Sequence, residues 1–327
     1  MRAREENAYF QHCWVSSWHP SRSTLKPGKS LNKMSQEKLF RRDMVLFFVA
    51  NFIWLFGLCM YHNFLPLYVK ELGGNDSSVS IIVSIPFFAG FLAILGGFLD
   101  RFWDRKSILI FGWAITIPAA IIFAFASNWK ILIIGQIIFS LTYICIPAAT
   151  LYVFEYESPG KKHLAYSFIY SGSIVGNILS PSVGGIIIHK FGMQTNFLLV
   201  AILFLFSMIC IAMLSEQKPS FDENIDRNTA IETQNLPHRK HFLSICLLFS
   251  AIEFSINIAE PYLSLFLNDF RHISVEWSGI AFTLMSLGSL IFTFSSGTQY
   301  VIKRSQLSIS FGMLLFIVGI ALTCFSG

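Results

Sequence analysis

Long apolar stretches alternate with short polar connections from residue 44 to the last residue of the chain. About 20 residues of α-helix cover the roughly 30 Å of hydrocarbon in a bilayer, and a helix satisfies its own backbone donors and acceptors there. Stretches of this length are found at 44–69, 79–99, 108–126, 131–154, 164–188, 196–214, 242–267, 277–296 and 307–324. The pattern therefore predicts an all-α integral membrane protein with about nine spans.

Two polar segments divide this pattern. Residues 1–43 are basic and lack hydrophobic periodicity, which is typical of a disordered tail. Residues 215–241 mix acidic and basic side chains and are interpreted as a linker. The predicted organisation is a tail (1–43), a first bundle of six helices (44–214), the linker (215–241) and the first three helices of a second bundle (242–327).

Composition and charge agree with a membrane protein. Hydrophobic residues make up 54% of the chain and charged residues 13%, which excludes a water-soluble domain. If the amino terminus is cytoplasmic, 20 of the 24 Lys and Arg residues lie on that side, and without the tail the count is still 11 against four. Because basic loops remain in the cytoplasm, we expect a multi-pass protein of the cell membrane with a cytoplasmic amino terminus. The net charge of +5 then reflects topology and an anionic inner leaflet, and no nucleic-acid partner is expected.

An internal repeat relates the two parts of the chain. Residues 64–71 correspond to residues 262–269 at an offset of 198, and Gly97 and Phe111-Gly112 have counterparts at an offset of 200. Agreement across two spans and a loop predicts parallel halves related by an axis along the membrane normal.

A charged, glycine-led turn lies between the second and third predicted spans. Glycine allows the end of a helix to approach a neighbour closely, and Asp100 can either pair with Arg105 or cap the next helix. The turn is a candidate functional element; a solvated charged turn is the simpler alternative. Its candidate residues are Gly96, Asp100, Arg101, Arg105 and Lys106.

Small residues recur at four-residue spacing in the fifth predicted span. Such spacing forms a groove against which another helix can pack, and Pro181 removes one backbone donor and permits a kink. The pattern consists of Gly172, Gly176, Ser180-Pro181 and Gly184-Gly185. Helix packing alone is the alternative to a functional motif.

With these motifs the chain resembles the major facilitator superfamily from residue 44 to residue 327. The turn fits the family's loop motif, although Phe98, Trp103 and Asp104 depart from it, and the resemblance implies that it latches two halves when the inner gate is shut. The glycine pattern resembles the motif of drug and proton antiporters, with Ser180 in place of a Gly, and implies export. The family has twelve spans, so we expect a truncated product that lacks the last three.

Candidates for the transport pathway lie on two spans. Such antiporters often carry a buried Arg in the fourth span, where this chain has Gly135 and Gln136. In the seventh span, carboxyl and amide groups recur at spacings of four and three and share one face, and charged groups at membrane depth usually face water or a partner. We hypothesise that a central cavity is lined by Asn51, His62, Glu253, Asn257 and Glu260, with Glu253 as the proton-coupling group. The alternative is that each polar group only holds helices together.

The predicted function is secondary active transport by alternating access, most directly proton-coupled efflux of a small solute by a monomer. No phosphate-binding loop, nucleophile motif or zinc motif is evident, so neither an enzyme nor a bound cofactor or metal is expected. A sugar or metabolite symporter or uniporter, a non-transporting fragment and a membrane scaffold remain as alternatives.

Overall fold

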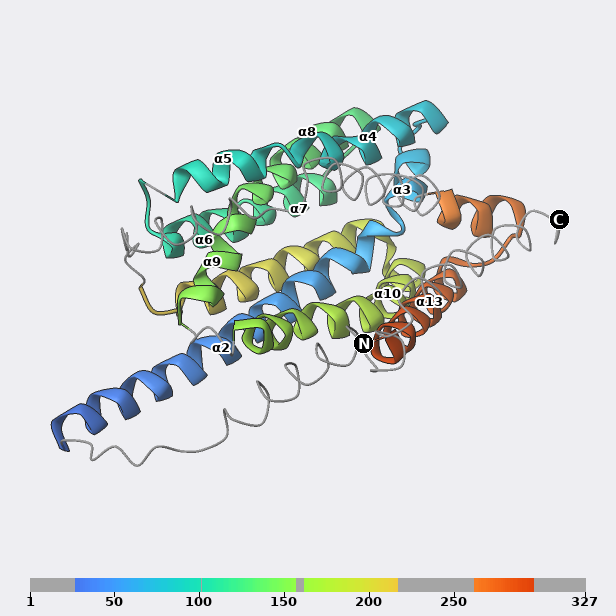
Figure 1. The fold of residues 1–327 in the computed structure, drawn as a ribbon. Coiled ribbons are helices and arrows are strands. Elements are labelled where there is room, and N and C mark those ends of the chain that lie inside the picture. The colour runs from blue at the N-terminus through green and yellow to red at the C-terminus, as the bar shows by residue number, and fades with distance from the viewer. Residues whose placement is uncertain (1–26, 101, 157–161, 217–261, 297–327) are drawn as a thin grey trace, which may run out of the picture. The chain divides into compact units, whose positions relative to one another are not determined.

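The computed structural model describes residues 27–100, 102–156, 162–216 and 262–296, and within them every regular element is a helix. Residues 1–42 and residues 43–327 form two compact units, and the packing described below lies within the second. Figure 1 shows the elements and labels the α-helices among them. They are α2 (Pro27–His62), α3 (Leu65–Glu71), α4 (Asp76–Ala89), α5 (Leu92–Leu99), α6 (Arg105–Ala114), α7 (Thr116–Ala124), α8 (Trp129–Ser140), the 3₁₀-helix η3 (Leu141–Cys145), α9 (Ile146–Tyr156), α10 (Lys162–Ala212), the π-helix η5 (Phe266–Phe270) and α13 (Val275–Ser296).

Five helical stretches of the described residues are long and apolar enough to cross a membrane. They are Arg42–His62, Asp76–Leu99, Arg105–Ala124, Trp129–Val153 and Ala165–Ala212. The prediction of an all-α integral membrane protein is thus confirmed. Residues 217–261 and 297–327 lie outside the described residues, so the total of nine spans stays a prediction.

The fifth stretch contains a reversal of the chain. It has 48 residues, which in one straight helix would be about 70 Å long, more than twice the hydrocarbon thickness. Gly192 breaks it with a φ of 82°, a left-handed value that glycine adopts without steric cost. Contacts advance along α2 before the break and return along it afterwards. The pairs are Gly172 with Phe48, Gly184 with Met60, Asn196 with Met60 and Ser207 with Ala50.

A second break separates α2 from α3. Because Pro66 has no N–H to donate to the carbonyl of His62, a continuous helix is not possible here. The N–H of Phe64 bonds three residues back rather than four, which releases the carbonyl of Met60. The buried side chain of Asn196 donates to that carbonyl at 3.1 Å, so the released acceptor is satisfied by another helix.

The amino-terminal tail differs from the prediction. α2 begins at Pro27, so residues 27–43, which were expected to be disordered, are helical. Proline suits the first position of a helix, and residues 34–42 are mostly strong helix formers such as Met, Gln, Glu, Lys, Leu and Arg. The pattern argument failed because it relied on hydrophobic periodicity alone. Residues 1–26 lie outside the described residues.

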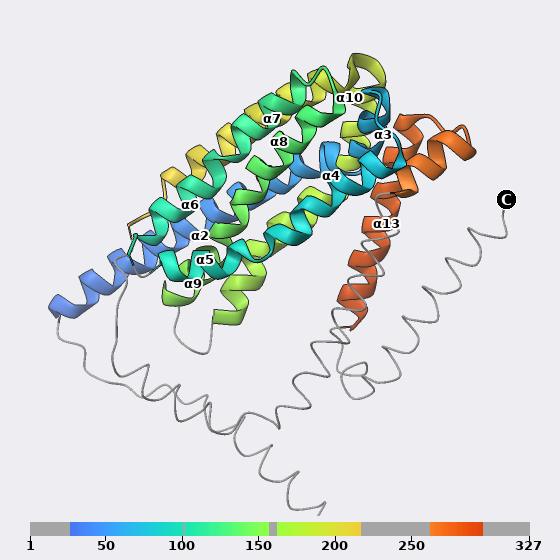
Figure 2. The ribbon, with the colours of Figure 1, turned by 90° about the horizontal axis from the view of Figure 1, so that it is seen from above.

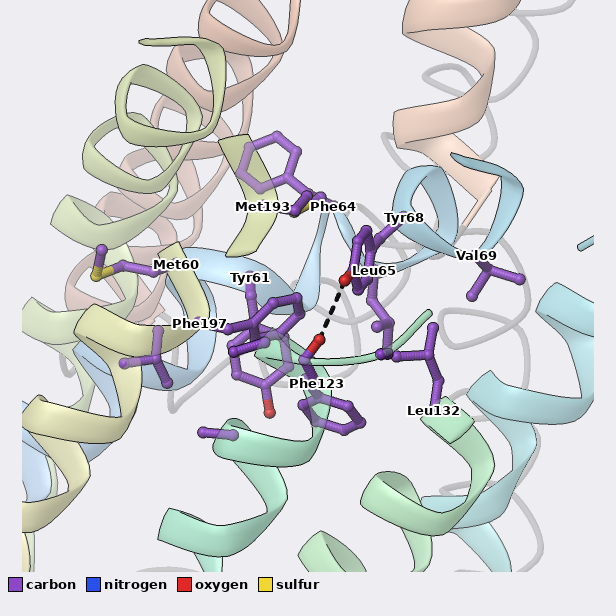
Figure 3. Close-up of a cluster of buried hydrophobic side chains, with 14 of the residues drawn as sticks. Met60, Tyr61, Phe64, Leu65, Tyr68, Val69, Phe123, Leu132, Met193 and Phe197 are labelled. Carbon is purple, nitrogen blue, oxygen red and sulfur yellow. Dashed lines mark hydrogen bonds between the residues drawn. The ribbon is translucent and has the colours of Figure 1, made fainter. Parts of the chain in front are cut away.

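Figure 3 shows a cluster of buried, largely aromatic side chains. We call the end of the bundle with α3 the Lys70 end, and the end where α5 meets α6 the Asp100 end (Figure 1). The ring of Phe197 in α10 lies 5.0 Å from that of Tyr61 in α2 and 5.3 Å from that of Phe123 in α7. The hydroxyl of Tyr68 in α3 donates to the carbonyl of Phe123 at 3.1 Å. These contacts fix four elements relative to one another at the Lys70 end.

Candidate functional site

The charged turn between α5 and α6 holds a buried ion pair. The guanidinium group of Arg105 donates two hydrogen bonds from Nε, at 2.9 and 3.2 Å, and one from Nη2, at 3.2 Å, to the carboxylate of Asp100. Both side chains are about nine-tenths buried. Of the two roles expected for Asp100, the structure places it in the pair with Arg105. Lys106 is half-buried, and Arg101 lies outside the described residues.

Two neighbours of this pair determine how the turn packs. A Cβ atom at Gly96 would collide with the carbonyl oxygen of Ile144 in η3, so only glycine allows this close approach. The carboxylate of Asp104 caps α6 by accepting a hydrogen bond from the N–H of Ser107 at 2.9 Å. Asp104, one of the three residues that depart from the family's loop motif, is therefore the helix cap, which leaves Asp100 for the ion pair.

The small residues of α10 pack first against α2. A Cβ atom at Gly172 would lie 2.6 Å from the carbonyl oxygen of Phe48, and one at Gly176 would lie 2.8 Å from that of Phe52. Gly184 meets the carbonyl of Met60 in the same way. Spaced at four and eight residues, these positions bring the two backbones into direct contact, as the groove predicted from the sequence requires.

A second face of α10 packs against α13. A Cβ atom at Gly185 would lie 2.8 Å from the carbonyl oxygen of Val275, and Gly279 of α13 lies against the carbonyl of Pro181. Between them the hydroxyl groups of Ser182 and Thr283 are 2.7 Å apart. In Figure 2, α13 runs at an angle to the helices of the bundle. The glycine motif thus serves two contacts, one with each neighbour.

Polar contacts join the Lys70 end to the segment of residues 262–296. The ammonium group of Lys70 lies 3.0 Å from Asp269 and 3.1 Å from Asp76. Hydrogen bonds to Asp269, and then to Asp76, raise the pKa of Lys70. The hydroxyl of Ser80 in α4 bonds with that of Tyr262. The sequence analysis missed this group, although the repeat aligns residues 64–71 with 262–269 and so places these charges at equivalent span ends.

The predicted pathway residues of α2 lie between two packed sides of that helix. Phe47 contacts the ring of Tyr152 in α9, and Phe48 meets α10. At about 100° per residue, Asn51 and His62 fall on the arc between these directions. The amide of Asn51 donates to the carbonyl of Phe47 at 3.0 Å, and His62 is exposed.

The remaining pathway residues, Glu253, Asn257 and Glu260, lie outside the described residues. Their place in the cavity therefore stays a prediction. Gln136, in the span where the sequence offers no Arg, is buried. In the part of the chain that the structure describes, no group of three or more His, Cys, Asp or Glu residues could hold a metal ion.

A band of polar and aromatic residues on α10 was also missed. Tyr166, Tyr170 and Ser173 are half-buried, and Asn177 is exposed. The rings of Tyr166 and Tyr170 stack with centroids 4.2 Å apart, and the hydroxyl of Tyr170 interacts with the side chain of Thr150 in α9. The spacings of four, three and four residues place the band on one face, a signal that the sequence does contain.

Comparison with known proteins assigns the family. The model of the Major Facilitator Superfamily matches residues 46–327. Multidrug resistance protein MdtG of Proteus mirabilis (strain HI4320) is 25% identical over 249 residues, which cover 73% of this chain and 61% of that protein. Multi-drug resistance efflux pump PmrA of Streptococcus pneumoniae serotype 4 (strain ATCC BAA-334 / TIGR4) is 26% identical over 231 residues, 67% of this chain and 57% of that protein. The chain spans about three fifths of the length of these relatives.

Solved structures agree in fold. A bacterial homologue of the human lysosomal transporter Spinster, in an inward-facing and unoccupied conformation, superposes with a TM-score of 0.57 at 14% identity over 80% of this chain and 62% of that one. The human organic anion transporter MFSD10 (TETRAN) gives a TM-score of 0.57 at 15% identity over 76% and 70%. Together with the family match over nearly all of the membrane-spanning region, these likenesses establish that the chain belongs to the Major Facilitator Superfamily.

Proposed function

We propose that the chain is part of a monomeric secondary transporter of the cell membrane that exports a small solute by alternating access in exchange for protons. The observation that carries alternating access is the position of the contacts made by residues 262–296. Those contacts concentrate near the Lys70 end and involve Lys70, Ser80 and the Pro181–Gly185 stretch of α10. A contact at one end is what a pathway open at the other end requires.

The direction of α13 is consistent with this interpretation, because α13 runs at an angle to the bundle helices (Figure 2). With the amino terminus in the cytoplasm, as the basic loops predict, the described state would be open toward the cytoplasm and closed outside. Export is supported by the names of the multidrug-resistance relatives, and Glu253 is the coupling group proposed from the sequence.

A reversible cross-link tests alternating access. The hydroxyl groups of Ser182 and Thr283 are 2.7 Å apart, so cysteines at both positions are close enough for a disulfide. The chain with Ser182→Cys and Thr283→Cys, reconstituted in proteoliposomes, should lose pH-driven solute flux on oxidation and regain it on reduction. Each single cysteine variant serves as control. Full flux through the oxidised double variant would refute alternating access at this contact.

A separate substitution tests proton coupling. Glu253→Gln should abolish flux driven by a pH gradient while the purified protein keeps its thermal stability, because an amide cannot bind and release the transported proton. Glu71→Gln, which alters an exposed carboxylate, is the matched control. An unchanged dependence of flux on pH in Glu253→Gln would remove this residue from the mechanism.

A further inference from the structure

The polar band of α10 lies next to the contact between α10 and α13. Asn177 precedes Pro181, the first residue of the contact with Gly279, by one helical turn, and Ser173, Tyr170 and Tyr166 continue the band toward the Asp100 end. Polar side chains at membrane depth that are not buried in protein usually face a water-filled cavity or a partner. The band therefore follows the side of α10 that a transport pathway would use.

The opposite side of the same helix behaves as a lipid-facing surface. Its exposed residues are all apolar, and at about 100° per residue they lie roughly opposite the tyrosines. They are Phe168, Val175, Leu179 and Val183, which are 43%, 42%, 49% and 37% exposed. Two further exposed residues of this stretch, Ser167 and Ile174, lie at the border between the two sides. The band therefore lies on a different side of α10 from the apolar surface.

The chemistry of the band is that of ring recognition. The stacked rings of Tyr166 and Tyr170, 4.2 Å apart, form a rigid aromatic edge, and their hydroxyl groups and Thr150 supply hydrogen bonds. Pro181 has no N–H for the carbonyl of Asn177 four residues earlier, so that acceptor is released beside the Asn177 amide. Residues 165–188 contain no charged side chain that could pair with an anion.

We propose that Tyr166, Tyr170, Thr150 and Asn177 form the solute-binding surface of this part of the transporter, and that the solute carries a planar aromatic ring and no obligatory negative charge. The assignment rests on the proposed transport function, because it places the solute on the pathway between α10 and α13. Recognition depends on ring contact and hydrogen bonds, so a neutral planar ring and a cationic one should both bind.

Direct binding to the purified chain in lipid nanodiscs tests this site without requiring transport. Acridone is the neutral planar probe, 9-aminoacridine is the cationic planar probe, and tetrapropylammonium is a cation without a ring. We expect fluorescence titration to show binding of both acridines and no competition by tetrapropylammonium. The double variant Tyr166→Ala and Tyr170→Ala should weaken both acridines by about tenfold, since lost ring contacts of this kind change affinity on that scale.

Two controls separate ring contact from general damage. Phe168→Ala removes an aromatic ring from the lipid-facing side of the same helix, where it stacks on Phe48, and should leave acridine binding unchanged. Phenylalanine at positions 166 and 170 should restore most of the affinity lost in the alanine variant. Wild-type affinity in the alanine double variant, or no binding of either acridine to the wild-type chain, would overturn the proposal.

The same samples distinguish this site from the function on which it rests. Tyrosine-dependent acridine binding without any pH-driven flux would support the site and contradict proton-coupled export. Conversely, pH-driven flux of acridine that is insensitive to the tyrosines would support export and contradict the site.

Discussion

The ammonium group of Lys70 lies 3.0 Å from the carboxylate of Asp269, although the two residues are 199 positions apart in the chain. The pair connects the end of α3 to η5 at the Lys70 end. Both side chains are more than one-third exposed, so each charge keeps part of its hydration. The pair is therefore suited to favour contact between α3 and η5 without making that contact permanent.

Reversing the charges tests that bias. Lys70→Glu places like charges beside Asp269 and Asp76 and should favour the open arrangement by about 1.4- to 5-fold, the effect of an exposed ion pair of about 0.2–1 kcal/mol. The fraction of cysteine labelled by an impermeant maleimide in a Ser80→Cys background measures the change. Adding Asp269→Lys should restore much of the closed population; labelling that ignores the charges would show that this pair does not hold the contact.

Alkaline pH should weaken the same contact. Because its pKa is raised above the ordinary 10.5 by Asp269 and Asp76, Lys70 contributes stability in full below that ordinary value. The contribution is lost as pH rises through the higher pKa of the folded state. Cysteine labelling at position 80 should thus change little between about pH 7 and 9 and increase above about pH 10.5. Lys70→Arg, which keeps its charge there, should abolish the alkaline increase.

Breaking the buried pair of the charged turn should destabilise the fold. Asp100→Asn leaves the guanidinium of Arg105 without its carboxylate, and removing one partner of a buried pair costs about 3–5 kcal/mol. Thermal unfolding in detergent, followed by tryptophan fluorescence, measures the loss. Asp104→Ala removes only an exposed cap and should cost about 1 kcal/mol. Equal losses in the two variants would contradict the distinction between pair and cap.

Two glycines, one in α5 and one in α10, allow a comparison between a position where a Cβ atom would collide with a neighbour and a position where it would not. At Gly184 an added methyl group would meet the carbonyl of Met60, so Gly184→Ala should cost about 1–3 kcal/mol through overpacking. At Gly97 a Cβ atom would meet nothing within 4 Å, and Gly97→Ala should be neutral or stabilising by up to about 1 kcal/mol. Unfolding temperatures of the two variants decide the point. A tolerated alanine at position 184 would mean that α2 and α10 can separate slightly without penalty.

The sequence allowed the helical spans and the packing role of the glycines to be predicted because both follow from short-range periodicity. Apolar length predicts a span, and four-residue spacing predicts a groove. The ion pair of Asp100 and Arg105 could be predicted for the same reason, since the two residues are only five positions apart in the sequence. The cap at Asp104 was not foreseen, because family resemblance drew attention to the missing basic residue.

Contacts between distant segments were harder to predict. Whether Gly185 faces α2 or α13 depends on how three helices cross, and the residue spacing within α10 does not determine that crossing. The pairing of Lys70 with Asp269 needs the two span ends to meet, which the repeat indicates only once its halves are placed in space. The tyrosine band was predictable from its spacing, but the glycines of the same helix dominated the interpretation.

The contact between α10 and α13 has one mechanical consequence. Backbone lies against backbone at Gly185 and Gly279, so at these two positions no side chain has to be displaced if the helices shift. The hydrogen bond between the hydroxyl groups of Ser182 and Thr283 then favours one register of the two helices. A contact of this kind suits a rotation of one helix against the other at constant separation.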